Sequence, residues 1–438
     1  MKITFIGAGS TVFARNVIGD CILTPELGEF DVYLFDIDAK RLDESYQILT
    51  NINKTMNGRA HIYQTLDRET AFRGADFVIN AIQVGGYDPC TITDFEIPKK
   101  FGLRQTIADT LGVGGIFRAL RTIPVMKSYA DDMERWCPNA ILLNYSNPMA
   151  MLTGYMQRYT DIKTVGLCHS VQYCVPHLLH TLEMDEYIDN CSWEISGINH
   201  QAWLLKIEDL QGNDIYPEIK SRANLLFEPE NRDKTLDFVR LEMMRQFGYY
   251  VTESSEHTSE YTPWFIKHKY PELIDYYKIP LDEYPRRCIE QINNWNETRA
   301  SLLQDAKIEH KKTHEFASYI IKAVMTDEVF RIHGNVLNTG LITNLPQNAC
   351  VEVPILVDRA GLHPCYVGDL PEQCAAINRT NINVQLLTLK AAETLKKEYI
   401  YMAAMLDPHT SSELSIDDTR ALVDAMIEAH GEWLPKFN

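Results

Sequence analysis

A cysteine and a histidine in separate segments are the residues of this sequence whose types most favour metal chemistry. Cys168 ends the apolar run 162–168 and is followed directly by His169, and His200 closes the segment SGINH. A thiolate and an imidazole together suit borderline divalent ions, and two protein ligands leave positions open for a hydroxylated substrate. Residue types alone also allow a second interpretation, in which the cysteine is inert core and the histidine is a satisfied polar group.

The N-terminal segment MKITFIGAGS has the pattern of a dinucleotide-binding turn. Gly7 permits a tight turn after the apolar strand, Gly9 lets a pyrophosphate approach the backbone, and Ser10 begins the next helix. Val12 stands where the full fingerprint has its third glycine. Asp36 ends the second apolar run, where an acid would hydrogen-bond the ribose hydroxyls and favour NAD. We therefore predict NAD binding at this turn; a strand–turn–helix packed with small residues is the alternative.

Apolar runs alternate with amphipathic stretches through the first part of the chain. We predict buried strands at 2–7, 31–36, 76–82, 140–143 and 162–168. We predict helices at 10–23, 38–57 and 115–136. This alternation is typical of right-handed βαβ units and a parallel sheet. The loop that begins at Gln83 would then lie near the nicotinamide half of the cofactor, although it is also an ordinary turn sequence.

Beyond about residue 190 this alternation stops. We predict extended chain at 193–207 and helices at 231–248, 372–406 and 415–430. The expected fold class is therefore α/β, with a Rossmann-like parallel-sheet domain packed on a mixed α+β domain. We place the NAD-binding domain at 1–190 and the substrate-binding and C-terminal helical domain at 191–438. The substrate cleft is expected at the carboxyl edge of the sheet.

The composition limits which kinds of partner are expected. The 438 residues carry a formal net charge of −18, which argues against nucleic acid or an anionic membrane surface as a partner. No stretch approaches the roughly 20 apolar residues of a membrane-spanning helix, and the N-terminus has no signal-peptide pattern. The ten cysteines show no framework spacing, so reduced thiols and a cytoplasmic location are expected.

Six motifs occur in order along the chain and together resemble glycoside hydrolase family 4. They are GAGS near the start, RQTIADTLGVGG at 104–115, NYSNPM at 144–149, GLCHSV at 166–171, SGINH at 196–200 and TESSEHTSEY at 252–261. Members of that family hydrolyse glycosides with NAD and a divalent metal instead of a carboxylate pair. The His-Ser-Val sequence after Cys168 resembles the α-galactosidase branch.

This resemblance implies a mechanism and a set of roles. NAD would take hydride from the sugar C3, a base would then remove the acidified C2 proton, and the leaving group would depart by elimination before water adds and the hydride returns. The metal, which we take to be Mn²⁺, would stabilise the developing negative charge. The implied residues are Cys168 and His200 as metal ligands, Tyr261 as base, His169 as leaving-group acid, and Asn147 and Arg299 as substrate contacts.

Several alternatives stay open from the residues themselves. Tyr261 lies in an aromatic-rich segment and Arg299 on an apparent solvated helix face, so both also fit ordinary structural roles. Glu256 is a second candidate for the base, and Arg104 and Asp109 are candidates to order the nicotinamide or the sugar. The substrate is expected to be an α-galactoside of the melibiose or raffinose type, with α-glucoside and α-galacturonide as alternatives. A net-redox dehydrogenase and a non-catalytic NAD-responsive protein are further candidates, and a homodimer or homotetramer is expected.

Overall fold

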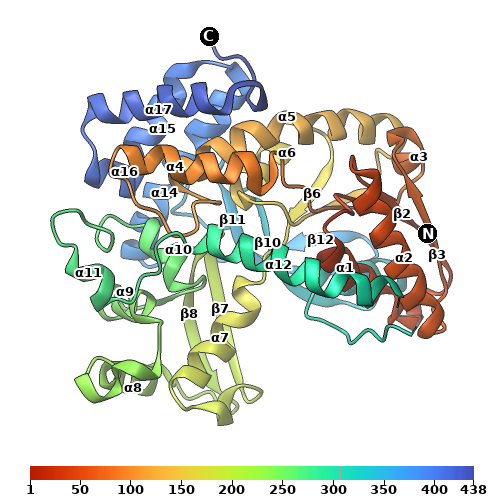
Figure 1. The fold of residues 1–438 in the computed structure, drawn as a ribbon. Coiled ribbons are helices and arrows are strands. Elements are labelled where there is room, and N and C mark those ends of the chain that lie inside the picture. Colours follow the sequence, from red (N-terminus) through yellow and green to blue (C-terminus); the bar gives the residue numbers. More distant parts are fainter. Residues whose placement is uncertain (305–306) are drawn as a thin grey trace.

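A single sheet runs through the molecule (Figure 1) in the computed structural model, which describes residues 1–304 and 307–438. Its order is β3-β2-β1-β4-β5-β6-β10-β11-β7-β8-β9, and β12 pairs with β11. The strands are β1 Lys2–Ile6, β2 Phe30–Phe35, β3 Ala60–Thr65, β4 Phe77–Asn80, β5 Ile141–Asn144, β6 Lys163–Gly166, β7 Cys191–Ile198, β8 Gln201–Asp209, β9 Tyr250–Val251, β10 Phe330–Leu337, β11 Cys350–Asp358 and β12 Gly361–Pro364.

Helices cover the sheet and extend beyond it. They are α1 Thr11–Ile22, α2 Ala39–Thr55, α3 Arg68–Phe72, α4 Ile92–Lys100, α5 Gly112–Trp136, α6 Met149–Tyr159, α7 Ser170–Thr181, α8 Tyr216–Leu225, α9 Phe238–Phe247, α10 Ser255–Glu260, α11 Glu272–Tyr276, α12 Glu283–Gln304, α13 Phe316–Thr326, α14 Glu372–Thr394, α15 Lys397–Leu406, α16 Pro408–Glu413 and α17 Ile416–His430. Within the described ranges, no helix combines the length and the apolar content that crossing a membrane requires.

The first six strands in the sheet order are parallel, as a Rossmann-like domain requires. Strand β4 is buried along its whole length because helices pack on both faces. Ile3 and Phe5 share one core with α1 and α2, and Val78 and Leu142 share another with α5 and α6. This half of the fold therefore places the carboxyl ends of β1, β4, β5 and β6 at one edge.

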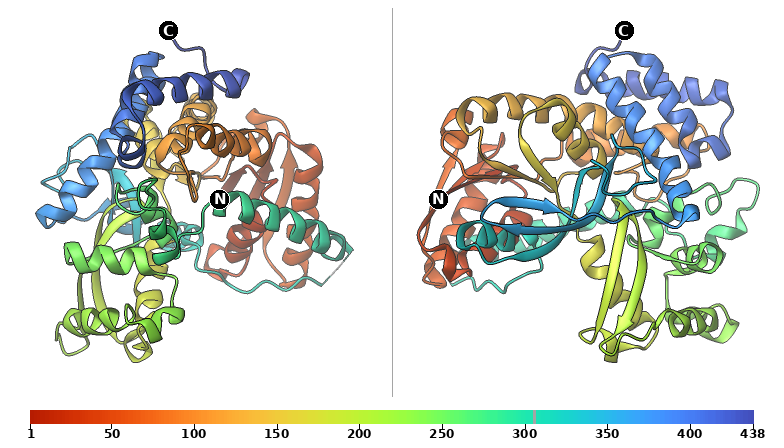
Figure 2. Two further views of the ribbon diagram at one scale, coloured as in Figure 1. Left: turned by 60° about the vertical axis from the view of Figure 1, so that its left-hand side comes forward. Right: turned by 180° about the vertical axis from the view of Figure 1, so that it is seen from behind.

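The rest of the sheet is antiparallel, and the strand that pairs with β6 comes from far along the chain. Strand β10 pairs with β6 through Asn335 and Gly166, and β11 pairs with β7 through Glu352 and Gly197. Figure 2 shows the β7–β8 hairpin extending away from the C-terminal helices. Two strands from the last third of the chain thus lie between β6 and β7.

The C-terminal helices form a layer on α5. Phe117 and Leu120 of α5 share a core with Ile400, Leu422 and Met426 from α15 and α17. Because this core joins a helix of the first half to the C-terminal helices, the two halves pack together in the described residues. The division at residue 190 remains a prediction.

Most of the predicted elements are confirmed, and three differ. The predicted helix at 372–406 is two helices, because Leu395 has a φ of 54° and its carbonyl accepts a hydrogen bond from the Asn438 amide. The extended chain predicted at 193–207 is the β7–β8 hairpin, and the helix predicted at 231–248 begins only at Phe238. Strand β3 was not predicted because it lies at the sheet edge and only its first residue, Ala60, is buried.

Candidate active site

Cys168 lies where strand β6 ends and helix α7 begins. The Ser170 amide at the start of α7 donates a hydrogen bond to Cys168 Sγ at 3.5 Å. Negative charge is favoured at a helix N-terminus, because the first amides of the helix have no partner within it. The position therefore suits a sulfur that binds a cation.

His200 occupies the tight turn of the β7–β8 hairpin. Ile198 pairs with Gln201, so Asn199 and His200 alone form the turn, and His200 has a φ of 62°. Positive φ is uncommon for a side-chain-bearing residue and marks a position that the surrounding structure fixes. The imidazole is buried, with 3 % of the residue exposed, so this turn directs it into the protein rather than into solvent.

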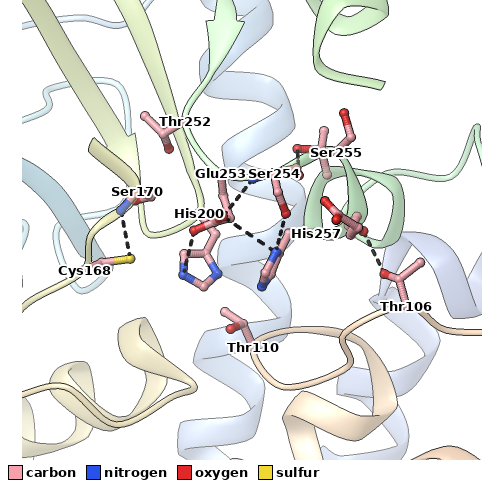
Figure 3. Close-up of polar contacts among 12 residues, drawn as sticks. Thr106, Thr110, Cys168, Ser170, His200, Thr252, Glu253, Ser254, Ser255 and His257 are labelled. Atoms are coloured by element: carbon pink, nitrogen blue, oxygen red, sulfur yellow. Dashed lines mark hydrogen bonds and ion pairs between the residues drawn. The ribbon is translucent and has the colours of Figure 1, made fainter. Parts of the chain in front are cut away.

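Three candidate ligand atoms converge at this point (Figure 3). The side-chain ligand atoms of Cys168, His200 and Glu253 all lie within 4.8 Å of one another, and His200 Nε2 is 3.5 Å from Glu253 Oε2. Glu253 follows strand β9 and was not among the predicted ligands. The dense ionisable run at 252–261 was the signal available in the sequence. We refer to these three residues as the Cys168–His200–Glu253 cluster.

The charges in this cluster fit a divalent cation. Burial alone would lower the pKa of His200, but the nearby Cys168 and Glu253 raise it to about 10. Burial would raise the pKa of Glu253, but His257, His200 and the Ser254 amide lower it. An excess of negative charge around a buried imidazole is what a bound cation would neutralise. A thiolate, an imidazole and a carboxylate form a donor set suited to a borderline first-row ion.

Two buried polar side chains fix the distance between the strands that hold the cluster. Asn335 Nδ2 on β10 donates to the Gly166 carbonyl on β6 at 3.4 Å and to Glu352 Oε1 on β11 at 3.2 Å. Glu352 is fully buried, and burial raises its pKa to about 7 although His200 and Asn335 lower it. These hydrogen bonds therefore link β6, which leads to Cys168, with β11, which pairs with the strand that leads to His200.

Tyr261 lies directly beside the cluster. Its hydroxyl is 3.0 Å from His200 Nδ1, and the residue is 1 % exposed. Burial and the nearby Asp109 carboxylate raise the pKa of Tyr261 well above its ordinary value, so loss of its proton needs a nearby cation. Because His200 Nε2 faces Glu253, ligation through Nε2 would leave the hydrogen on Nδ1, where it can be donated to a Tyr261 phenolate.

His169 lies next to Cys168 and faces outward. Its Nε2 is 2.8 Å from Glu315 Oε2, and its side chain is 40 % exposed. Burial lowers the pKa of His169, but Glu315 raises it more, so the net shift is upward. A histidine that keeps its proton and remains accessible is suited to protonating a leaving group.

Asp109 and Asn147 are brought to the same centre. Asn147 Nδ2 donates to Asp109 Oδ2 at 3.1 Å, and His257 Nε2 is 3.8 Å from Asp109 Oδ1. Burial would raise the pKa of Asp109, but His257 and Arg118 lower it, so the group is ionised. The loop before α5 is anchored by Glu260, whose carboxylate accepts hydrogen bonds from the amides of 106–108.

The glycine turn has the shape that a dinucleotide needs. Gly7 has a φ of 80°, and a Cβ there would lie 2.7 Å from the Ala81 carbonyl oxygen. The Gly9 amide donates to Asp36 Oδ2 at 2.7 Å, and a Cβ on Gly9 would meet that same oxygen at 2.8 Å. Ser10 precedes α1 directly. The chain can therefore make this tight turn between β1 and α1 only because both residues are glycines.

Other predicted residues lie elsewhere or already have partners. Arg299 is not brought to the cluster: its Nε donates to Glu44 Oε1 on α2 at 2.7 Å, because α12 packs on the nucleotide half. Glu256 pairs with Arg287 at 2.9 Å, and Arg104 donates to the Lys267 carbonyl at 3.5 Å. Gln83 is exposed and lies 3.4 Å from Thr91 Oγ1.

Comparison with known proteins gives a consistent result. The model described as "Family 4 glycosyl hydrolase" matches residues 2–184, and the model of that family's C-terminal domain matches residues 195–410. An alpha-galactosidase of Bacillus subtilis is 57 % identical over 436 residues, covering 100 % of this chain and 99 % of the relative.

Two solved structures have the same fold. A putative glucosidase from Bacillus subtilis superposes with a TM-score of 0.86 at 24 % identity, covering 97 % of this chain and 99 % of its own. A 6-phospho-beta glucosidase from Thermotoga maritima, solved with manganese, NAD+ and glucose-6-phosphate, has a TM-score of 0.80 at 22 % identity and full coverage of both chains. Through both family models and the close relative, this chain belongs to family 4 of the glycosyl hydrolases.

Proposed function

We propose that the protein is an NAD- and Mn²⁺-dependent α-galactosidase acting on substrates such as melibiose and raffinose. The observation that carries this proposal is the Cys168–His200–Glu253 cluster with Tyr261 in hydrogen-bond contact, at the carboxyl edge of a dinucleotide-type sheet. The galactoside specificity is supported by the relative at 57 % identity that is named an alpha-galactosidase. The cofactor assignment is supported by the neighbour solved with manganese and NAD+.

The candidate binding residues form two sites, one for NAD and one for the metal. Gly7, Gly9 and Asp36 would hold NAD at the turn after β1, and the cluster would hold the metal. When bound, NAD would accept and return a hydride, and the divalent ion would stabilise negative charge on the substrate oxygens.

Two side chains would move protons. Tyr261 oxygen would accept the proton from the sugar carbon next to the oxidised one, and the His200 Nδ1–H hydrogen bond would stabilise its phenolate. His169, kept protonated by Glu315, would donate a proton to the departing glycosidic oxygen. Asn147 and Asp109, which hydrogen-bond to each other, would hold sugar hydroxyls. We also propose a homodimer or homotetramer in the cytoplasm.

A panel of chromogenic glycosides tests this function. The purified protein is incubated with p-nitrophenyl α-galactoside, α-glucoside or α-galacturonide, each with and without NAD and Mn²⁺. We expect release of p-nitrophenol mainly from the α-galactoside, dependent on both additions, with no build-up of NADH at 340 nm. Steady NADH accumulation would indicate a net-redox dehydrogenase instead, and preference for another glycoside would reassign the substrate.

A further inference from the structure

A cavity of about 480 Å³ opens beside the Cys168–His200–Glu253 cluster. Its walls come from three segments: the first half of α7, residues 235–240 and residues 252–256. His169 and Glu253 line it, as do His177 on α7 and Asp237 just before α9. The cavity therefore adjoins the candidate leaving-group acid, whereas Asn147 and Asp109, assigned to hold the reacting sugar, do not line it.

Two residues that line the cavity have buried hydroxyl groups without a partner among the described residues. Ser170 Oγ and Thr252 Oγ1 make no hydrogen bond to any residue that the structure describes, although the residues are only 6 % and 2 % exposed. Figure 3 shows both residues on segments next to Glu253. Unpaired buried hydroxyls cost free energy and point to a bound molecule or water that completes them.

The charged side chains on the wall already have partners. Arg240 Nε lies 2.5 Å from Asp237 Oδ1, and its other nitrogen donates to the Thr252 carbonyl at 3.0 Å. His169 is paired with Glu315 at 2.8 Å, so both of these cations already have carboxylate partners. Burial and Arg240 lower the pKa of His177, which leaves that ring neutral. The carboxylates are accounted for as well, because Glu256 pairs with Arg287 at 2.9 Å and Glu253 belongs to the Cys168–His200–Glu253 cluster, so the wall favours a neutral ligand.

An aromatic ring stands at the cavity wall. Tyr173 lines the cavity and is 54 % exposed, a high value for an aromatic side chain. Other residues that line the cavity carry hydroxyl and carboxylate groups, which can hydrogen-bond sugar hydroxyls. An aromatic ring such as that of Tyr173 can pack against the apolar face of a sugar ring. The combination fits a neutral polyhydroxylated molecule.

We propose that this cavity binds the leaving group of the glycoside as a neutral sugar, the sucrose part of raffinose being one example. The inference rests on the proposed hydrolase function and adds the leaving-group site to it. Thr252 and Ser170 hydroxyls would bond the leaving sugar, Tyr173 would pack against it, and His169 would protonate its departing oxygen.

Two variants test the site, each with a matched control. Thr252→Val removes one unpaired hydroxyl without changing side-chain shape, and Tyr173→Ala removes the ring. Thr388→Val is the control for the first, because Thr388 is buried and its hydroxyl donates to its own helix at Val384. Tyr366→Ala is the control for the second, because Tyr366 is 72 % exposed and does not line the cavity.

We expect each cavity variant to raise the KM for raffinose about two- to tenfold, the effect of one lost hydrogen bond or contact. The inhibition constant of free galactose should stay unchanged, because galactose has no leaving group, and calorimetry should show weaker binding of sucrose alone. The two controls should match the wild type throughout.

Three outcomes would overturn the assignment or its basis. An equal rise in the galactose inhibition constant would place the reacting sugar in this cavity instead. Unchanged raffinose and sucrose binding in both variants would leave the cavity with no ligand role. A wild-type protein that released galactose from no α-galactoside would instead refute the hydrolase function on which the inference rests.

Discussion

The dinucleotide turn is assembled from residues 7–36, whereas the Cys168–His200–Glu253 cluster takes its side chains from segments that follow β6, β7 and β9. In the first region, a single strand–turn–helix and the next strand bring Gly9 and Asp36 into hydrogen-bond contact. In the second, β10 and β11 must lie between β6 and β7 before Cys168 and His200 can meet. The geometry of the glycine turn is thus a local property of the chain, while the geometry of the cluster is a property of the whole sheet.

The largest effect is expected in the cluster itself. Cys168→Ser replaces the sulfur ligand with a hydroxyl oxygen, which binds a borderline ion poorly. Activity should fall by more than about a hundredfold, because losing a ligand costs more than losing a residue that only orients one, and the latter loss costs up to about a hundredfold. Cys365→Ser is the matched control, because Cys365 is similarly half-buried and makes only a weak contact to a carbonyl. The measurement is kcat/KM at saturating NAD with increasing Mn²⁺; wild-type activity in Cys168→Ser would remove this cysteine from the site.

The second-largest effect tests whether metal binding at the cluster depends on β10 and β11. Glu352→Ala removes the carboxylate that Asn335 bonds between the strands, and Mn²⁺ affinity should fall about 10- to 100-fold. Glu352→Gln should retain most of the affinity because the amide keeps the shape and an acceptor. Glu194→Gln, at an exposed position on β7, is the control. Manganese binding is followed by electron paramagnetic resonance, and an unchanged dissociation constant in Glu352→Ala would contradict the dependence.

A smaller effect, confined to the other region, is expected at the glycine turn. In Gly9→Ala the new Cβ would approach Asp36 Oδ2 at 2.8 Å and Arg41 Cβ at 3.0 Å, so the turn must shift. The dissociation constant for NAD should rise about two- to tenfold, while that for Mn²⁺ stays the same. Fluorescence titration with NAD measures the change, and excess NAD should restore the rate. A parallel loss of metal affinity would show that the two regions are not independent.

Arg299→Ala should have the smallest effect. Its guanidinium is paired with Glu44 on α2, away from the cluster, so KM and kcat for the galactoside should match the wild type. Steady-state kinetics on p-nitrophenyl α-galactoside provide the measurement. A KM raised severalfold would restore the substrate role that family resemblance implies for this residue.

The same contrast explains what the sequence could predict. Gly7, Gly9 and Asp36 were identifiable because their spacing within one βαβ unit determines their contacts. Cys168 and His200 were identified through family resemblance, since nothing near either residue specifies β10 and β11 as the strands between them. Glu253 was missed because it follows a two-residue strand that is placed only by pairing with β8. Arg299 lies away from the cluster because the packing of α12 on α2, which no local pattern encodes, decides where that helix face points.

The position of β10 and β11 in the middle of the sheet has a consequence for biosynthesis. A nascent chain is extended from its N-terminus, so the parallel strands and the glycine turn can fold while the rest is still being translated. The thiol and the imidazole come together only after the ribosome has released residue 358, the end of β11. The residues of the glycine turn are therefore all synthesised long before the strands that bring Cys168 and His200 together.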